Sequence, residues 1–343
     1  MERRCLGGDS ELSVSPICLG TWQFGGTADN EDNTWGYQEE ETSKQIVNKA
    51  LELGINFFDT AEAYGRDRRA ERMLARCLEG RHRADVVIAS KFGRFEDGKP
   101  KAFDGVDIEK SLDETLEALK TTYVDIYQIH WAVNIKDPVE TVTTLERLKA
   151  KGKLRHYGLS NFGRGNMREF KESGGKPVTN QLPYNLLWRA VEYDITAECK
   201  ANNIGILAYS PLAQGLLSGR FTKPEDVPEG RRRTRHFSKS STSLSRHGQE
   251  GAEKETFEAI EAIRGVCRSA DISMPSASLA WLLAQPNVAS CIVGARTAEQ
   301  VEANARLVQL SEETIKKLSA ASETLKEKLG SNPDMWASES RYL

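Results

Sequence analysis

Four side chains that can hold or pass a proton follow three apolar runs of the sequence. Asp59 directly follows one run and Tyr64 comes after a short loop, Lys91 lies two residues beyond a second run, and His130 directly follows a third. A tyrosine hydroxyl has an unperturbed pKa of roughly 10, which a neighbouring ammonium lowers, while a carboxylate keeps that ammonium charged and oriented. A histidine opposite can hydrogen-bond a substrate oxygen. These groups together are suited to protonating a carbonyl oxygen while a cofactor delivers hydride to the carbon.

Each of these residues has a simpler interpretation when it is taken alone. Asp59 could cap a turn, Tyr64 could be an aromatic at a rim, Lys91 could extend to solvent, and His130 could be a hydrogen-bonded core histidine. Their joint placement at successive strand ends favours the chemical interpretation. The sequence offers no nucleophile–base pair for hydrolysis beside them and no carboxylate cluster for a metal ion, so no metal is expected.

The elements that must position these residues alternate along the chain. Eight short apolar runs rich in Val, Ile and aromatic residues are separated by amphipathic stretches, such as the stripe formed by Ile108, Leu112, Leu116 and Leu119. Uniformly apolar runs are typical of parallel strands that are covered on both faces. The runs are Ile17–Leu19, Ile55–Phe58, Val86–Ala89, Val124–Ile129, Leu154–Leu159, Val178–Leu182, Ile204–Ala208 and Ala289–Val293.

Eight strand–helix units in series predict an α/β protein with a (β/α)8 TIM barrel. The competing arrangement is a doubly wound open sheet, for which a G-x-G-x-x-G segment after the first strand would be evidence. The segment 19–26 lacks that spacing and a following helix, so the barrel is favoured. Catalytic groups of such barrels lie at the carboxyl ends of the strands, which is where the four residues fall.

Composition narrows the class of protein. The 343 residues include 47 basic and 50 acidic side chains, a net charge of −3, which gives no field to attract nucleic acid or an anionic membrane. No apolar run is long enough to span a membrane, and the N-terminus does not resemble a signal peptide. Six cysteines without C-x-x-C spacing indicate reduced thiols. We therefore expect a cytoplasmic protein that binds neither nucleic acid nor membranes.

Long loops interrupt the regular alternation in two places. We expect residues 1–343 to form a single barrel domain, with a core at about 10–325 and long loops after strand one (27–41) and strand seven (213–250). The second loop carries a basic run, 231–239. This run is similar in composition to a nuclear-localisation patch, but a solvated or phosphate-covering loop is the preferred interpretation. The tail after about residue 311 starts with a capped helix and is expected to be peripheral.

Several segments at the strand ends make the sequence similar to the aldo-keto reductase superfamily. Within it, the chain resembles the branch of microbial and plant oxidoreductases related to potassium-channel β subunits. The resemblance runs over about residues 10–325. It is carried by Asp59-Thr60-Ala61-Glu62-Ala63-Tyr64-Gly65, Lys91, Ile129-His130-Trp131, Gly158-Leu159-Ser160-Asn161-Phe162, Tyr209-Ser210-Pro211-Leu212 and Gly294-Ala295-Arg296-Thr297-Ala298-Glu299-Gln300.

The resemblance implies reversible NADPH-dependent reduction of aldehydes and ketones to alcohols, with hydride from nicotinamide C4. Tyr64 is then the general acid, Lys91 lowers its pKa, Asp59 pairs with Lys91, and His130 orients the carbonyl. The residues implied to bind the cofactor are Trp22, Ser160, Asn161, Gln181, Tyr209, Ser210, Leu212, Gln214, Gly215, Gly294, Arg296, Gln300 and Asn304.

Arg296 bears on the choice of cofactor because a guanidinium can bind a 2′-phosphate bidentately. It favours NADPH (NADP+), with NADH possible, although Gln300 stands where several family members have an arginine. Trp22, Trp131 and Trp35 are candidates for a substrate pocket, while Trp188 could equally pack beneath the loops. The expected partner is a small carbonyl compound, and the chain is expected to be a monomer or a weak homo-oligomer.

Two other functions are compatible with a barrel of this kind. A regulatory module could sense the cofactor without rapid turnover, although the full set of proton-handling residues argues against it. A redox-neutral isomerase or lyase would need a metal cluster or a Schiff-base lysine in an apolar pocket, and Lys91 beside Asp59 does not fit the latter.

Overall fold

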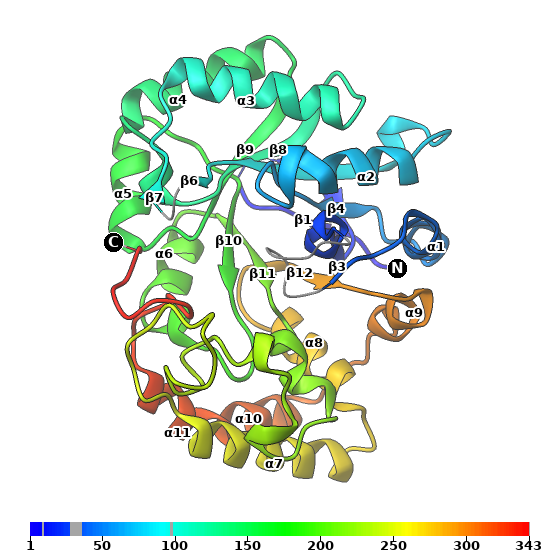
Figure 1. The fold of residues 1–343 in the computed structure, drawn as a ribbon, viewed down its shortest axis with the longest axis vertical. Coiled ribbons are helices and arrows are strands. Elements are labelled where there is room, and N and C mark those ends of the chain that lie inside the picture. Colours follow the sequence, from blue (N-terminus) through cyan, green and yellow to red (C-terminus); the bar gives the residue numbers. More distant parts are fainter. Residues whose placement is uncertain (9, 28–35, 97–98, 343) are drawn as a thin grey trace.

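Eight parallel strands close into a barrel in the computed structural model, which describes residues 1–8, 10–27, 36–96 and 99–342 (Figure 1). All eight predicted runs coincide with these strands, which confirms the (β/α)8 fold. Almost every strand residue is buried, because helices cover the outside and side chains fill the inside. In barrel order the strands are β3 (Ile17–Gly20), β4 (Phe57–Asp59), β5 (Val87–Phe92), β8 (Val124–Ile129), β9 (Leu154–Ser160), β10 (Thr179–Pro183), β11 (Gly205–Tyr209) and β12 (Val288–Gly294).

Helices surround the barrel in Figure 1. Side-chain caps begin several of them, with Asp104 accepting hydrogen bonds at α3, Asp137 at α4 and Ser311 at α10. The helices are α1 (Glu40–Glu52), α2 (Arg69–Cys77), α3 (Gly105–Ala118), α4 (Pro138–Ala150), α5 (Arg164–Glu172), α6 (Ile195–Ala201), α7 (Glu253–Ser269), α8 (Met274–Leu283), α9 (Ala298–Ala305), α10 (Glu312–Ala321) and α11 (Glu323–Leu329). None of the described helices is both long and apolar enough to cross a membrane.

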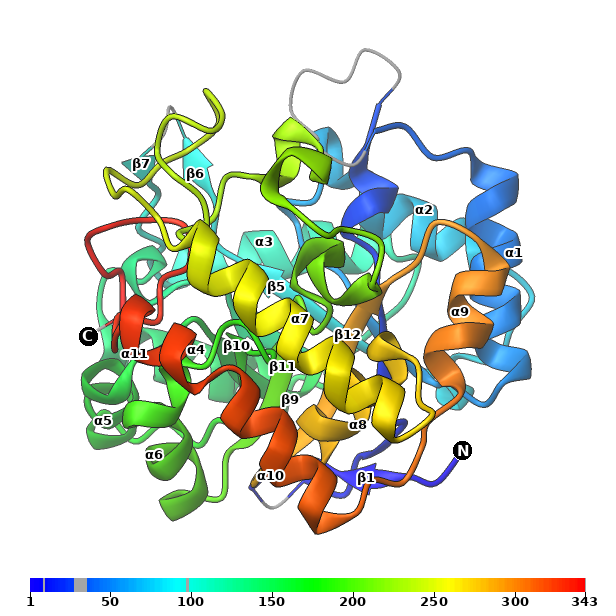
Figure 2. The ribbon, with the colours of Figure 1, turned by 90° about the horizontal axis from the view of Figure 1, so that it is seen from below.

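The two ends of the barrel differ. In Figure 2 the hairpin of β6 (Phe95–Glu96) and β7 (Lys99–Pro100) lies at the top with the yellow-green loop after β11, while β1 (Arg4–Cys5) lies at the opposite end. β1 pairs with β2 (Ser13–Val14), and apolar residues of this N-terminal segment pack in one cluster with inward side chains of the strands. The amino ends of the strands are thereby closed, and the carboxyl ends face the long loops.

The centre of the basic run 231–239 is buried and not solvated, which corrects that part of the expectation. Arg235 is buried and donates hydrogen bonds to the carbonyl oxygens of Leu329, Asn332 and Asp334. His236 is also buried, beside Trp188. The centre of the run therefore anchors the loop after β11 to the C-terminal segment.

Two further expectations are settled by packing. Trp188 is fully buried and donates from its indole nitrogen to the carbonyl oxygen of Pro333, so it packs beneath the loops. The tail is not peripheral at its end, because the Tyr342 hydroxyl lies 2.5 Å from Asn161 Oδ1, at the end of β9. The candidate Trp35 lies outside the described residues.

A close contact between two glycines fixes the turn that carries Tyr64. Gly65 has φ 83° and ψ 163°, a conformation that essentially only glycine adopts. A Cβ added there would lie 2.4 Å from the carbonyl oxygen of Gly25, and a Cβ at Gly25 would lie 2.6 Å from the Tyr64 backbone. The segment after β3 and the turn after β4 can approach this closely only because both residues lack a side chain.

We predict that Gly65→Ala lowers the free energy of unfolding by about 2–4 kcal/mol, since it combines backbone strain with a steric clash. Gly80→Ala is the matched control, because Gly80 also has a positive φ (77°) but a Cβ there meets no atom within 4 Å. We expect the control to lose only about 1 kcal/mol. Urea unfolding of the two variants measures the difference, and equal losses would contradict the close-contact explanation.

Candidate active site

Lys91 and Asp59 form a buried ion pair at the carboxyl ends of β5 and β4. Asp59 is in register with Ala89 on the neighbouring strand, and Lys91, two residues further on, points to the same face of the sheet. The Lys91 Nζ atom lies 2.7 and 2.9 Å from the two Asp59 carboxylate oxygens and 2.9 Å from the carbonyl oxygen of Thr60. Burial acts to lower the pKa of Lys91, but the charge of Asp59, the neighbouring Tyr64 and the hydrogen bonds to both residues together outweigh it, and the net pKa is raised. Lys91 therefore stays charged.

The Tyr64 hydroxyl is the third partner of this ammonium group. Lys91 Nζ donates to the Tyr64 oxygen over 3.0 Å, so Tyr64 keeps its own proton for another acceptor. Burial raises the pKa of Tyr64, and the Lys91 charge opposes that rise without cancelling it. Tyr64 is consequently a protonated phenol at neutral pH, next to a fixed positive charge that stabilises its phenolate.

Two amide side chains hold the other side of the carboxylate. Gln181 Nε2 donates to Asp59 Oδ2 at 2.8 Å and Gln128 Nε2 does so at 3.4 Å. Gln181 is one of the candidates for cofactor binding, and in this structure its amide nitrogen is directed to Asp59. Gln128 was missed by the sequence analysis, although its place two residues before His130 on a strand puts both on one face.

His130 lies across from Tyr64, with its ring 6.0 Å away and edge-on. Its Nδ1 atom is 3.1 Å from the carbonyl oxygen of Gly93, so Nδ1 carries the proton and Nε2 presents a lone pair. Burial, together with the charges of Lys91 and Arg341, lowers the pKa of His130 to about 3. His130 is therefore neutral at physiological pH.

A second buried ionic group holds the loop that positions His130. Glu62 accepts a hydrogen bond from the Gly93 nitrogen at 2.8 Å, while the Gly93 oxygen faces His130. Arg68 pairs with Glu62 at 2.9 Å and with Glu71 at 3.3 Å. The sequence analysis did not single out these residues. The available signal was four charged residues in the short segment between Asp59 and the helix that follows it.

Asn161 connects β9 to the loop after β11 and to the C-terminus. It adopts a left-handed conformation (φ 59°), and its Nδ2 atom donates to the carbonyl oxygen of His130 and to Ser160 Oγ. Its Oδ1 atom accepts from the Tyr209 hydroxyl at 3.0 Å and from the Tyr342 hydroxyl at 2.5 Å. Tyr342 was missed because no local pattern links a terminal tyrosine to a residue in β9.

The loop after β11 leaves polar atoms of the protein without partners. Gln214 has a left-handed backbone (φ 54°), and both its amide nitrogen and its amide oxygen are buried without a hydrogen-bond partner among the described residues. Buried polar atoms of this kind are costly unless a bound molecule satisfies them. Ser210 (φ 52°) and Gly215 (φ 96°) complete a tight turn, and Leu212 is half-buried beside them.

Three arginines gather next to this turn. A Cβ at Gly215 would lie 3.3 Å from Arg231 Nη1. Burial lowers the pKa of Arg231, and the positive charges of Arg220 and Arg296 lower it further. Cations that repel one another at one place are suited to a polyphosphate, so the turn and its arginines fit a dinucleotide.

The remaining residues that were predicted to bind the cofactor lie around α9. Arg296 donates from Nη2 to the carbonyl oxygen of Tyr37 at 2.9 Å, and its backbone nitrogen donates to Gln300 Oε1 at 2.8 Å. The Gln300 side chain thus holds the backbone before α9. Gly294 ends β12 and Asn304 is buried on α9.

The substrate side is aromatic. Trp22, 37% exposed, lies 6.2 Å from the Tyr64 ring, and Trp131 is buried against Tyr342 at 5.7 Å. The Arg341 guanidinium lies 3.7 Å from the centre of the Trp131 ring. The structure therefore brings two of the three predicted pocket tryptophans to the end of the barrel that carries Tyr64.

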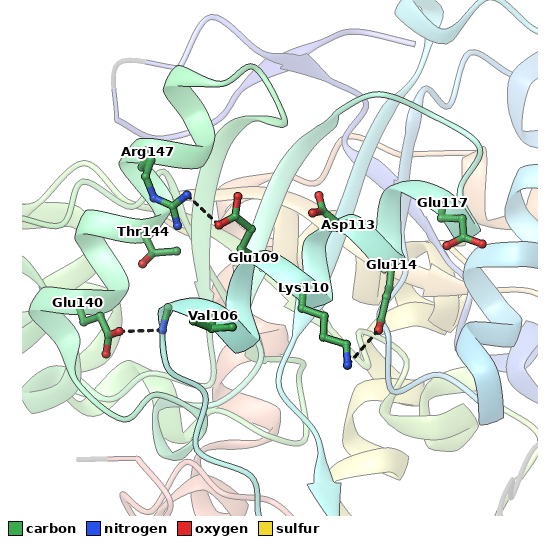
Figure 3. A pocket seen from close by; sticks show the side chains of 10 residues that line it. Val106, Glu109, Lys110, Asp113, Glu114, Glu117, Glu140, Thr144 and Arg147 are labelled. Atoms are coloured by element: carbon green, nitrogen blue, oxygen red, sulfur yellow. Dashed lines mark hydrogen bonds and ion pairs between the residues drawn. The ribbon is translucent and has the colours of Figure 1, made fainter.

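A hollow of about 550 Å³ lies elsewhere, on the outer helices α3 and α4 (Figure 3). Its ionic groups pair with one another, as Glu109 does with Arg147 at 2.8 Å and Lys110 does with Glu114 at 3.9 Å. It shares no residue with the strand ends, and none of its described lining residues has a buried unsatisfied group, so the strand ends remain the candidate site. No three His, Cys, Asp or Glu side chains of the described ranges are grouped to hold a metal ion.

Comparison with known proteins agrees with this geometry. A model of the Aldo/keto reductase family matches residues 16–323, and the chain belongs to this family. It is 28% identical over 320 residues to the NADH-specific methylglyoxal reductase of Escherichia coli (strain K12), with 89% of this chain and 93% of that protein covered. It is also 28% identical over 331 residues to the aldo-keto reductase yakc [NADP(+)] of Schizosaccharomyces pombe, covering 93% and 90%.

A solved structure shows the same architecture. The glycerol dehydrogenase AKR11B4 from Gluconobacter oxydans superposes with a TM-score of 0.76 at 26% identity, over 93% of this chain and 94% of its own. The protein is therefore an NAD(P)H-dependent oxidoreductase. Relatives named for NADH and for NADP(+) both match, so family membership alone leaves the preferred nicotinamide cofactor open.

Proposed function

We propose that the chain reduces the C=O group of aldehydes and ketones to an alcohol, reversibly, with Tyr64 as the proton donor. The observation that carries this proposal is the buried chain of contacts from Asp59 through Lys91 to the Tyr64 hydroxyl, with distances of 2.7 and 3.0 Å. A phenol held beside a permanent ammonium gives up its proton more easily than one buried alone.

The proposed roles of the residues follow from their contacts. The bound nicotinamide cofactor supplies the hydride for the carbonyl carbon. Tyr64 donates its free proton to the carbonyl oxygen as negative charge develops there, and Lys91 stabilises the phenolate that remains. The Asp59 carboxylate keeps Lys91 charged and in place, and Gln181 and Gln128 fix that carboxylate.

His130 acts as a hydrogen-bond acceptor and not as a donor to the carbonyl oxygen of the substrate. With the proton on Nδ1, its Nε2 atom accepts hydrogen bonds. It is suited to accept one from the hydroxyl group of the alcohol, and its neutral ring packs beside Tyr64 to orient the substrate oxygen. Glu62 maintains this arrangement through Gly93.

We further propose NADPH as the preferred cofactor. Ser160, Asn161, Gln181 and Tyr209 would hold the nicotinamide end, and the Gln214 turn would hold the pyrophosphate. Gly294, Arg296, Gln300 and Asn304 would surround the adenosine end. The support for a phosphate-rich ligand is the cluster of Arg220, Arg231 and Arg296, in which burial and then the two neighbouring charges lower the pKa of Arg231. Trp22 would border both cofactor and substrate, and Trp131 would line the substrate pocket.

Tyr64→Phe tests the proton donor. We expect kcat/KM for aldehyde reduction to fall about 10²- to 10⁴-fold, because the acid is lost while the ring remains. Cofactor affinity, measured by quenching of tryptophan fluorescence, is expected to stay unchanged. Tyr193→Phe, at an exposed position on the outside of the barrel, is the matched control and should retain full activity. Retention of wild-type turnover by Tyr64→Phe would sink the proposal.

Arg296→Met tests the cofactor preference separately. The variant is expected to bind NADPH about 10- to 100-fold more weakly and NADH almost as before, because only NADPH carries the additional phosphate. Arg306→Met is the control, since Arg306 is exposed near the end of α9 and pairs only with Glu302 among the described residues. Equal loss of affinity for both cofactors would show that Arg296 does not distinguish them.

A further inference from the structure

Arg233 occupies an unusual position at the carboxyl ends of the strands. Its guanidinium lies over the ring of Trp22 at 5.4 Å and over the ring of Trp336 at 4.9 Å. Trp22 is in turn 6.2 Å from the ring of Tyr64. The loop after β11 and the C-terminal segment thereby place one cation beside the aromatic wall that borders the proposed proton donor.

Within the part of the chain that the structure describes, no carboxylate pairs with this arginine. Its Nε atom is buried without a hydrogen-bond partner, and no carboxylate of the described ranges forms an ion pair with it. Arg341, which lies over the ring of Trp131, does have an anionic partner, because its guanidinium donates to the Asp334 carboxylate at 2.5 and 2.8 Å. Burial lowers the pKa of Arg233 to about 10, and the charge of Arg246 adds to this effect. Arg233 is thus a cation at neutral pH that the fold has partly desolvated and left unpaired.

Arg233 is also separate from the arginines proposed to hold the cofactor. The charges that act on Arg231 are those of Arg220 and Arg296, whereas the one that acts on Arg233 is that of Arg246. The side chain of Arg233 lies over two indole rings, one of which faces Tyr64.

We propose that Arg233 binds a carboxylate on the substrate, so that the enzyme prefers carbonyl compounds that carry an acid group a few atoms from the C=O. A guanidinium pairs with a carboxylate through parallel N–H···O bonds, and desolvation beside Trp22 and Trp336 strengthens such a pair. The aromatic rings offer a surface for the part of the substrate between its two polar ends. This inference rests on the proposed reduction at Tyr64.

The test compares two aldehydes of nearly the same shape, 4-carboxybenzaldehyde and its uncharged methyl ester, methyl 4-formylbenzoate. In the wild type we expect a KM for the acid at least about tenfold below that for the ester. Arg233→Met should raise the KM of the acid at least about tenfold. The KM of the ester, kcat and the NADPH dissociation constant should stay unchanged.

Two further variants separate specific binding from general effects. Arg233→Lys keeps the charge but not the planar fork, and is expected to fall between the wild type and Arg233→Met. Lys239→Met removes an exposed cation of the same loop and should change nothing. Arg233→Met is expected to unfold at the same temperature as the wild type or higher, because it removes an unpaired buried charge.

The outcomes distinguish this inference from the proposed function. Equal effects of Arg233→Met on acid and ester would overturn the inference, and so would a loss of NADPH affinity, which would assign the arginine to the cofactor. If the wild type reduces neither aldehyde, the proposed function fails. In that case the binding of 4-carboxybenzaldehyde can still be measured by quenching of tryptophan fluorescence, because Trp22 and Trp336 adjoin Arg233. Equal binding by the wild type and Arg233→Met would contradict the inference.

Discussion

The rest of the site depends on one interaction, the buried ion pair between Lys91 and Asp59. An ammonium that is removed from water stays charged only if a carboxylate and further acceptors surround it, and Lys91 has Asp59, the Thr60 carbonyl and the Tyr64 hydroxyl. The contribution of such a pair to stability is small because desolvation offsets attraction. The ion pair matters because it holds the positive charge of Lys91 next to the Tyr64 hydroxyl, whose proton the proposed reaction uses.

The barrel makes this arrangement possible because neighbouring parallel strands place their carboxyl ends at one rim. Strand register sets Lys91 beside Asp59. The close contact between Gly25 and Gly65 fixes the turn after β4, so that the Tyr64 hydroxyl lies next to Lys91. The proposed substrate specificity has another source. Arg233 comes from the long loop after β11, and such loops can vary in sequence without disturbing the strands.

Features carried by local sequence could be predicted. The strands are continuous apolar runs, so all eight were located, and the proton-handling residues follow them directly. The remaining features are long-range. Tyr342 meets Asn161 across 181 residues of sequence, and Glu62 acts on His130 through the backbone of Gly93. The prediction of a solvated loop was wrong for the centre of the basic run 231–239, because charge indicates solvent exposure, whereas carbonyl oxygens far along the chain satisfy Arg235.

The central claim is that the charge of Lys91 determines how readily Tyr64 releases its proton. The most direct measurement is the pH dependence of alcohol oxidation, which requires the Tyr64 phenolate, in the wild type and in the double variant Asp59→Asn/Lys91→Met. The double variant leaves neither charge buried alone. Because Lys91 acts on the pKa of Tyr64 more strongly than Asp59 does, this account predicts that oxidation by the double variant rises only at higher pH than in the wild type. An unchanged pH profile would contradict it.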